Sequence, residues 1–237
     1  MALGTYDANG IWHYGESDNI ALFSDTLNKL ADSASSAITA DRARLATLEA
    51  GSLSGLIPVK PTSVVVAGGT ATTSNLGVVS FTNATALSLN GIFTNAYSVY
   101  KMIIFVPNAT LAAQCAFRFR SAGTDNSSSN YYQTQLLSRV TGTTQTNSGG
   151  PLTFGSLFGW LGAISNDYQM LIVDISNPMK AMKKNISGIA VANDGTSMFQ
   201  SMVLNLFNAN SLTFDGFTIY PTAGTFSGTV QILAYNN

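Results

Sequence analysis

The stretch QCAFRFRS, residues Gln114–Ser121, decides the fold of this chain. Apolar Cys115, Phe117 and Phe119 alternate with Ala116 and two arginines. Because successive side chains of a β-strand point to opposite faces, this period of two predicts a strand with one buried and one wet face. Cys115 is the single cysteine of the sequence, which excludes an intrachain disulfide, and its place in the pattern predicts a buried structural thiol.

Similar short runs continue to the C-terminus, separated by turn residues and without helical patterns between them. This spacing predicts a mainly β domain over residues 78–237, an antiparallel β-sandwich of jelly-roll-like form. Residues 155–164 fit a strand or a short helix, and we expect a loop or helical turn there. The expected strands are Val78–Thr82, Ala86–Asn90, Ser98–Val106, Gln114–Ser121, Tyr131–Val140, Gln169–Ile175, Ile186–Ala192, Phe199–Phe207, Leu212–Tyr220 and Thr229–Tyr235.

Residues 51–77 differ in composition from the segments on either side. They are rich in Gly, Ser, Pro, Thr and Val, with prolines at Pro58 and Pro61 and the pair Gly68-Gly69. Such residues punctuate regular structure and suit extended chain. We therefore expect an extended linker with one short strand at Ser63–Ala67.

Residues 18–50 predict a long α-helical stem. Ser17 or Asp18 can cap its start, Gly51 supplies a stop, and neither Gly nor Pro interrupts it. Apolar residues recur at nearly heptad spacing, with a stutter at Asp41, so this narrow and alanine-rich stripe favours weak self-association. The alternative is an amphipathic helix lying on the β domain. The expected contacts of a trimeric stem are Leu27, Leu30, Ala34, Ile38, Leu45 and Leu48.

Residues 1–17 form an aromatic arm. Asn9-Gly10 fits a two-residue hairpin turn, and a lone hairpin is marginal in water. We therefore expect the arm to dock onto a partner surface through Tyr6, Trp12 and Tyr14; the alternative is an arm folded onto its own domain. His13 is the single histidine of the sequence, and its place in the arm favours a structural or interface role.

Composition limits the classes of function. The chain has 237 residues, of which 46% are hydrophobic and 10% are charged, with a formal net charge of −1. The apolar fraction can supply a core, whereas the low charge suits a protein fixed in an assembly or working outside a cell. Nucleic-acid binding is disfavoured because basic residues are few, and the cluster Lys180, Lys183 and Lys184 is expected in a solvated turn.

Targeting and chemistry leave few signals in the sequence. No apolar stretch of about 18 residues is present, so we expect no membrane span, and the start of the chain lacks the pattern of a secretory signal. Five carboxylates in the β region stand mostly near turn signals, and neither a phosphate loop nor a spaced calcium loop is visible. We therefore expect no enzyme activity, no metal and no cofactor.

One polar stretch suggests adhesion to sugars. Tyr131 and Tyr132 follow a segment rich in Asn and Ser that ends at Asn130. Aromatic rings beside amide and hydroxyl groups suit stacking and hydrogen bonding to glycans. Asn130, Tyr131 and Tyr132 are therefore candidate ligand contacts, and the alternative is that the tyrosines are buried in a strand.

Two parts of the chain resemble a known class of protein. The leader, with residues 6–12, 16–18, 24–33 and 40–49, resembles the leaders and helical stems of minor virion proteins in tailed bacteriophages of actinobacteria. Residues 97–104, 117–121, 130–132 and 226–235 resemble strands of phage tail-fibre-like β domains, although Asn236 stands where related closing strands tend to have glycine. The resemblance implies trimers that are anchored by the leader, with β domains projecting outward, and it supplies no catalytic residues.

These observations together predict a homotrimeric virion structural protein. It would be made in the bacterial host cytoplasm and exposed on the particle as a tail-fibre or receptor-binding adhesin, anchored through its N-terminal arm. Its expected partners are further copies of itself, other virion proteins and a host cell-surface glycan. The alternative is a capsid decoration or head-fibre protein, and a polysaccharide-degrading enzyme is the least favoured reading.

Overall fold

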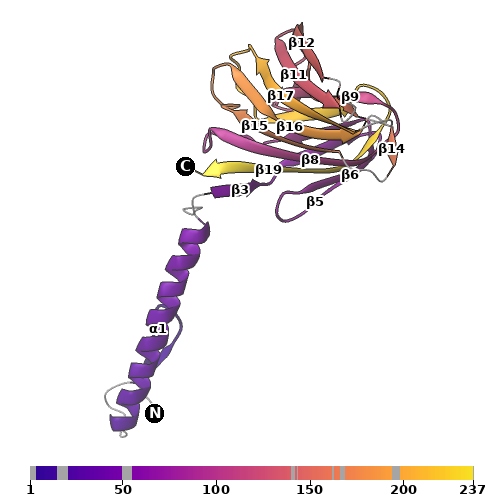
Figure 1. Ribbon diagram of the computed structural model, residues 1–237. Helices are drawn as coiled ribbons and strands as arrows, with labels where there is room; N and C mark the ends of the chain where they lie inside the picture. Colours follow the sequence, from indigo (N-terminus) through magenta and orange to yellow (C-terminus); the bar gives the residue numbers. More distant parts are fainter. Residues whose placement is uncertain are drawn as a thin grey trace. The chain divides into compact units, whose positions relative to one another are not determined.

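A computed structural model describes residues 4–14, 21–49, 55–139, 142, 144–161, 163–165, 169–193 and 198–236. The chain divides into two compact units, Met1–Ser54 and Gly55–Asn237 (Figure 1). The predicted helix caps at Ser17, Asp18 and Gly51 lie outside the described residues.

The N-terminal unit consists of a hairpin and a helix. Strands β1 (Gly4–Tyr6) and β2 (Trp12–Tyr14) pair antiparallel, and α1 runs from Ala21 to Glu49, inside the predicted range 18–50. The connection is longer than the predicted two-residue turn because it spans residues 7–11. The carboxylate of Asp7 stabilises it by accepting hydrogen bonds from the backbone N–H groups of Asn9 (2.8 Å) and Ile11 (3.0 Å).

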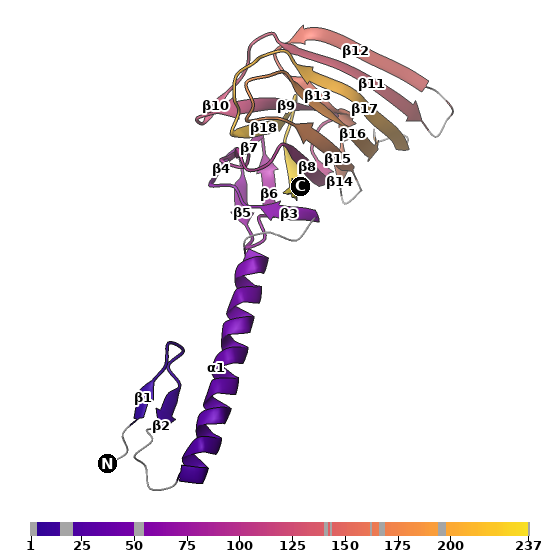
Figure 2. The same ribbon diagram turned by 90° about the vertical axis from the view of Figure 1, so that its left-hand side faces the viewer.

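The larger sheet of the C-terminal unit is antiparallel, with strand order β12-β11-β17-β16-β15-β8-β19-β6-β5 (Figures 1 and 2). Two further strands lie off this path, β14 against β8 and β3 against β19. The bounds are β12 (Thr144–Leu152), β11 (Tyr131–Arg139), β17 (Met198–Asn208), β16 (Lys184–Asn193), β15 (Met170–Ser176), β8 (Val99–Ala109), β19 (Phe226–Asn236), β6 (Val79–Ala84), β5 (Thr70–Thr73), β14 (Ile164–Ser165) and β3 (Gly55–Val59).

The smaller sheet is also antiparallel and has the order β10-β9-β18-β7-β4, with β13 paired to β9. Its strands are β10 (Thr124–Asp125), β9 (Ala113–Ser121), β18 (Gly216–Pro221), β7 (Ala86–Asn90), β4 (Ser63–Ala67) and β13 (Gly155–Leu161). The mainly β, antiparallel prediction for this part of the chain is therefore confirmed.

One hydrophobic core lies between the two sheets. Phe117 and Phe119 of β9 are buried in it with Phe217 of β18, and the rings of Phe117 and Phe217 stack with centroids 5.5 Å apart. Tyr100 and Ile104 of β8 enter the same core from the larger sheet. Cys115, Phe117 and Phe119 are buried as the alternation predicts, but the other face is not fully wet, because Ala116 is buried and Arg118 and Arg120 are half-buried. Burial raises the pKa of the Cys115 thiol to about 12, as expected for an inert structural cysteine.

The order of pairing joins distant parts of the sequence. β8 pairs with β19, β9 pairs with β18, and β11 pairs with β17. Strands of the second half of the unit thus pair, in reverse order, with strands of the first half, and successive pairs alternate between the larger and the smaller sheet. The innermost pair, β15 with β16, is a hairpin that also borders β8.

Three expectations differ from the structure. The strand expected at Ser63–Ala67 is present as β4, but residues 55–73 also contain β3 and β5, which pair in the larger sheet where we expect an extended linker. Residues 155–161 form β13 rather than a loop, since they pair with β9. β12 was not expected at all: it is a polar, glycine-containing edge strand whose pattern does not alternate.

Among the described residues, no helix combines the length and the apolar character needed to cross a membrane.

Candidate interaction surfaces

The apolar stripe of α1 faces solvent in the single chain. Leu30 is 66% exposed and Leu45 is 55% exposed, and Ile38 and Ala34 are exposed as well. Leu27 is half-buried, and the side chain of Leu48 lies outside the described part of the chain. Most of the residues predicted as stem contacts are therefore accessible to another molecule.

The hairpin covers a different flank of the same helix (Figure 2). The side-chain amide of Asn9 donates to the hydroxyl of Ser35 (2.5 Å), and its carbonyl oxygen accepts from Arg42 (2.8 Å). Ala31 is buried on this flank. At about 100° per residue, Ala31, Ser35 and Arg42 are centred roughly a quarter turn away from the stripe. The hairpin thus leaves the stripe uncovered.

His13 lies between one carboxylate of the hairpin and one of the helix. Its Nε2 lies 3.4 Å from Asp7, and its Nδ1 lies 3.5 Å from Asp32 of α1. A hydrogen bond from Ser35, followed by one from the backbone N–H of Ile11, holds the pKa of Asp7 far below its ordinary value. The carboxylate that organises the loop therefore stays ionised at any ordinary pH.

The three predicted docking residues have different environments. Tyr6 is 70% exposed, and its ring meets that of Trp12 edge-on with centroids 5.0 Å apart. Trp12 is half-buried, and the side chain of Tyr14 lies outside the described residues. The hairpin contacts the helix of its own unit, as the alternative prediction for the arm states. Docking of the arm to a particle stays a prediction.

The predicted sugar-contact group is only partly exposed. Tyr131 is fully buried; its hydroxyl accepts from the backbone N–H of Phe119 (2.9 Å) and donates to the carbonyl of Asn126 (3.0 Å). The assignment of Tyr131 as a ligand contact is therefore wrong, because a strand directs alternate side chains into the core. Tyr132 points to the other face and is 41% exposed, whereas half-buried Asn130 accepts a hydrogen bond from Asn208 (3.1 Å).

The basic cluster differs from the expectation at one of its three lysines, since Lys180 and Lys183 are exposed as predicted. Lys184 is fully buried, and its ammonium group donates to the carbonyls of Lys180, Met182 and Leu212. Desolvation lowers the pKa of Lys184. This lysine thus joins two loops by hydrogen bonds inside the unit and is not a solvated turn residue.

The described carboxylates of the β unit are mostly engaged in structural pairs. Asp125 pairs with Arg120, whose guanidinium also donates to Ser88, Thr218 and Asn90. Asp167 and Asp194 lie outside the described residues. Within the described ranges, no group of three or more His, Cys, Asp or Glu residues is arranged to hold a metal ion.

A surface that the sequence analysis did not identify covers the outer side of β8, β15 and β16. Ile103, Ile172 and Ile189 stand directly opposite one another across these three strands, and Phe105, Met170 and Val191 form the neighbouring row. Met170 and Ile189 are more than two-fifths exposed. We call these six residues the outer apolar face.

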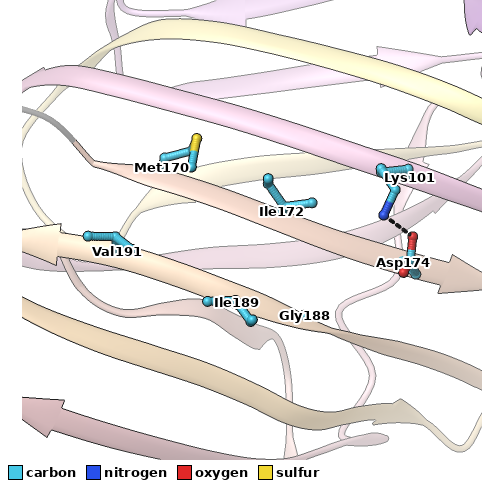
Figure 3. Close-up of a pocket in the computed structure, with 7 residues that line it drawn as sticks. All are labelled: Lys101, Met170, Ile172, Asp174, Gly188, Ile189 and Val191. Atoms are coloured by element: carbon cyan, nitrogen blue, oxygen red, sulfur yellow. Dashed lines mark hydrogen bonds and ion pairs between the residues drawn. The ribbon is translucent and has the colours of Figure 1, made fainter.

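A shallow hollow of about 340 Å³ lies on this face (Figure 3). It is lined by Met170, Ile172, Ile189 and Val191, and at one end Lys101 forms an ion pair with Asp174 at 2.8 Å. The hydroxyl of Tyr235 donates to the same Asp174 oxygen (2.8 Å). Burial alone would lower the pKa of Lys101, but its interactions with Asp174 and Tyr235 raise that pKa above its ordinary value.

The sequence does carry a signal for the outer apolar face. Residues 102–106 read MIIFV and residues 170–173 read MLIV, without the polar residues that should alternate along a strand with one wet face. Continuous apolar runs are typical of strands that are covered on both faces. The runs predict strands, and their lack of polar residues indicates a second face to cover.

Comparison with known proteins gives little guidance. No family model and no curated protein matches the chain. Among solved structures, it is similar to the catalytic domain of an endo-1,3-beta-glucanase (laminarinase) from Thermotoga petrophila, with 10% sequence identity and a TM-score of 0.21 over 73% of this chain and 77% of that chain. Similarity at this level carries no inference about the fold or the activity.

Proposed function

We propose that the protein is a bacteriophage virion structural protein, a trimeric tail-fibre-like or receptor-binding adhesin that is anchored through its N-terminal arm. The leader and the closing strands resemble such proteins. The structural observation that carries the proposal is the exposed stripe Leu30, Ala34, Ile38 and Leu45 on α1. A helix that holds its own hairpin on one flank, and exposes an apolar stripe on another, suits association with parallel copies.

The same proposal assigns roles to the two units. α1 acts as a stem that guides three chains together, and the β unit, as a jelly roll, forms the exposed head. The nested pairs β8–β19, β9–β18 and β11–β17 support the jelly-roll assignment. The scarcity of charge in the chain supports a fixed place in an assembly. Burial of a large stem side chain would contribute at most about 1.5–3 kcal/mol each.

Locating the protein on intact particles tests this function. Gold-labelled antibodies against the chain should decorate the tail tips of purified particles from the phage whose genome encodes it. Label on the head would favour the capsid decoration protein instead. Absence of the chain from purified particles would contradict both virion roles.

The adhesin role has a sharper test at Tyr132. This ring is the exposed aromatic of the predicted sugar-contact group. We take for a stacked sugar the roughly 1–3 kcal/mol that a base stacked on an aromatic side chain contributes. Tyr132→Ala should therefore weaken binding of the protein to host cells by about 5- to 150-fold. Tyr97→Ala, at a half-buried ring elsewhere in the unit, serves as the control. Unchanged binding of a folded Tyr132→Ala protein would remove this residue from the adhesive surface.

A further inference from the structure

The outer apolar face has an unusual composition for the solvent side of a sheet. Antiparallel sheets with one covered face normally place polar side chains on the other. Here Ile103, Ile172 and Ile189 form a continuous aliphatic row across β8, β15 and β16. The neighbouring apolar residues of these strands are already buried in the core; they are Met102, Ile104, Leu171, Val173 and Ala190. These central strands therefore have the composition of strands that are buried on both sides.

The charges on this surface indicate what covers it. On the described outer positions of β8, β15, β16 and β19, the charged residues are Lys101 and Asp174, one of each sign and already paired. Such a surface offers no net charge to an acidic or a basic partner. The same neutral, aliphatic face on a second copy matches it in composition, so the aliphatic rows of two copies can pack together while each Lys101–Asp174 pair stays within its own chain.

The chemistry of the hollow argues against a sugar as the occupant. Saccharides are held by aromatic rings and by hydrogen-bonding groups. The lining residues Met170, Ile172, Ile189 and Val191 offer neither, and the Lys101–Asp174 pair is engaged with Tyr235. Aliphatic side chains are the complementary surface for such a wall.

We propose that the outer apolar face is the contact surface between β units of three copies of this chain, with the faces packed together about the threefold axis. This deepens the proposed function, because it rests on trimer formation and names the surface that supplies most of its stability. The alanine-rich stripe of α1 then aligns the chains, and the Ile103–Ile172–Ile189 row holds the β units together.

Charge insertion on the face tests the proposal in the full chain. Ile189→Asp and Met170→Asp place a carboxylate at positions that are already exposed in the single chain, so the fold should be retained, as checked by circular dichroism. Each substitution should raise the concentration at which half of the chains are assembled by at least about tenfold, measured by sedimentation velocity. Val65→Asp is the matched control, since Val65 is a β-branched strand residue that is 54% exposed on the smaller sheet.

The outcomes separate this inference from the function it rests on. Trimers that persist unchanged in both Ile189→Asp and Met170→Asp would overturn the inference and leave the trimeric function standing. Equal loss of assembly in Val65→Asp would also overturn it, because the effect would not be specific to the face. A wild-type chain that stays monomeric would contradict trimer formation itself.

Discussion

At the scale of single residues, Tyr131 is a candidate ligand contact by sequence but has a structural role in the fold. Its hydroxyl satisfies the N–H of Phe119 and the carbonyl of Asn126 at the point where β11 begins beneath β9. Desolvation raises the pKa of Tyr131 above its ordinary value, so the phenol stays neutral and keeps donating its proton. The adjacent Tyr132 has the opposite orientation, which makes it a matched partner for testing this role.

Removing the Tyr131 hydroxyl should therefore destabilise the β unit. Tyr131→Phe leaves a buried donor and a buried acceptor without their partner, which costs about 1–3 kcal/mol in the free energy of unfolding. Tyr132→Phe should lower it by less than Tyr131→Phe does, because the Tyr132 side chain is 41% exposed. Urea unfolding measures both, and equal midpoints for the two variants would contradict the assignment.

Lys101 predicts a dependence of stability on pH. Because its pKa is raised above the ordinary 10.5, the folded chain holds the proton more tightly than the unfolded chain does. The stabilisation is therefore fully present below pH 10.5 and is lost as the pH rises through the folded pKa. Lys101→Met should cost about 0.5–1 kcal/mol at pH 8, a modest value because the pair is partly solvated.

The measurement is the difference in unfolding free energy between wild type and Lys101→Met, followed from pH 8 upward. The difference should shrink above the folded pKa. A difference that stays constant across the alkaline range would show that the methylene stem of Lys101, and not its charge, provides the stabilisation.

At the scale of elements, the hairpin and α1 form one unit through the Asn9–Ser35 and Asn9–Arg42 contacts. Ser35→Ala removes the hydroxyl that serves Asn9 and Asp7. At about 1 kcal/mol for a hydrogen bond, amide exchange of the hairpin, residues 4–14, should become about fivefold faster in hydrogen–deuterium exchange. Ser36→Ala is the control because Ser36 is exposed on another side of α1. Identical exchange in the two variants would contradict the role of the hairpin contact.

The strands differ in how far the sequence predicts them. Gln114–Ser121 was predictable because burial on one face imposes a period of two. β12 was not, because an edge strand has one partner and its polar, glycine-containing composition matches that of a loop. β3 and β5 were assigned to a linker because their prolines and threonines mark loops, although edge positions tolerate them. The pairing of β3 depends on β19, far away in the sequence, whereas β5 pairs with its neighbour β6.

The candidate surfaces also differ in how far the sequence predicts them. The stripe on α1 could be predicted, since helical spacing alone places Leu30, Ile38 and Leu45 together. The outer apolar face could not be assembled from sequence, because it needs the registers that bring Ile103, Ile172 and Ile189 side by side. The burial of Tyr131 likewise depends on which of two adjacent tyrosines faces the core.

At the scale of the whole molecule, the two units carry separate apolar surfaces that association of identical chains would cover. The stem stripe is thin because alanines such as Ala34 offer little area, whereas the outer apolar face is built from large aliphatic side chains. We therefore expect the β units to dominate the stability of the trimer.

A stem variant tests that ranking. Leu30→Asp with Ile38→Asp should raise the half-assembly concentration less than Ile189→Asp with Met170→Asp does, because alanines such as Ala34 leave little further apolar area around the two stem residues to be buried. Ser36→Asp provides the control on a different side of α1. Complete loss of assembly in the stem variant, with little effect of Ile189→Asp, would reverse the ranking.

The mass of the full chain in solution tests the central claim most directly. Light scattering coupled to size-exclusion chromatography at micromolar concentration should give three times the 24.9 kDa of the single chain. A mass equal to that of one chain, across the same range of concentrations, would contradict the account of a trimeric structural protein.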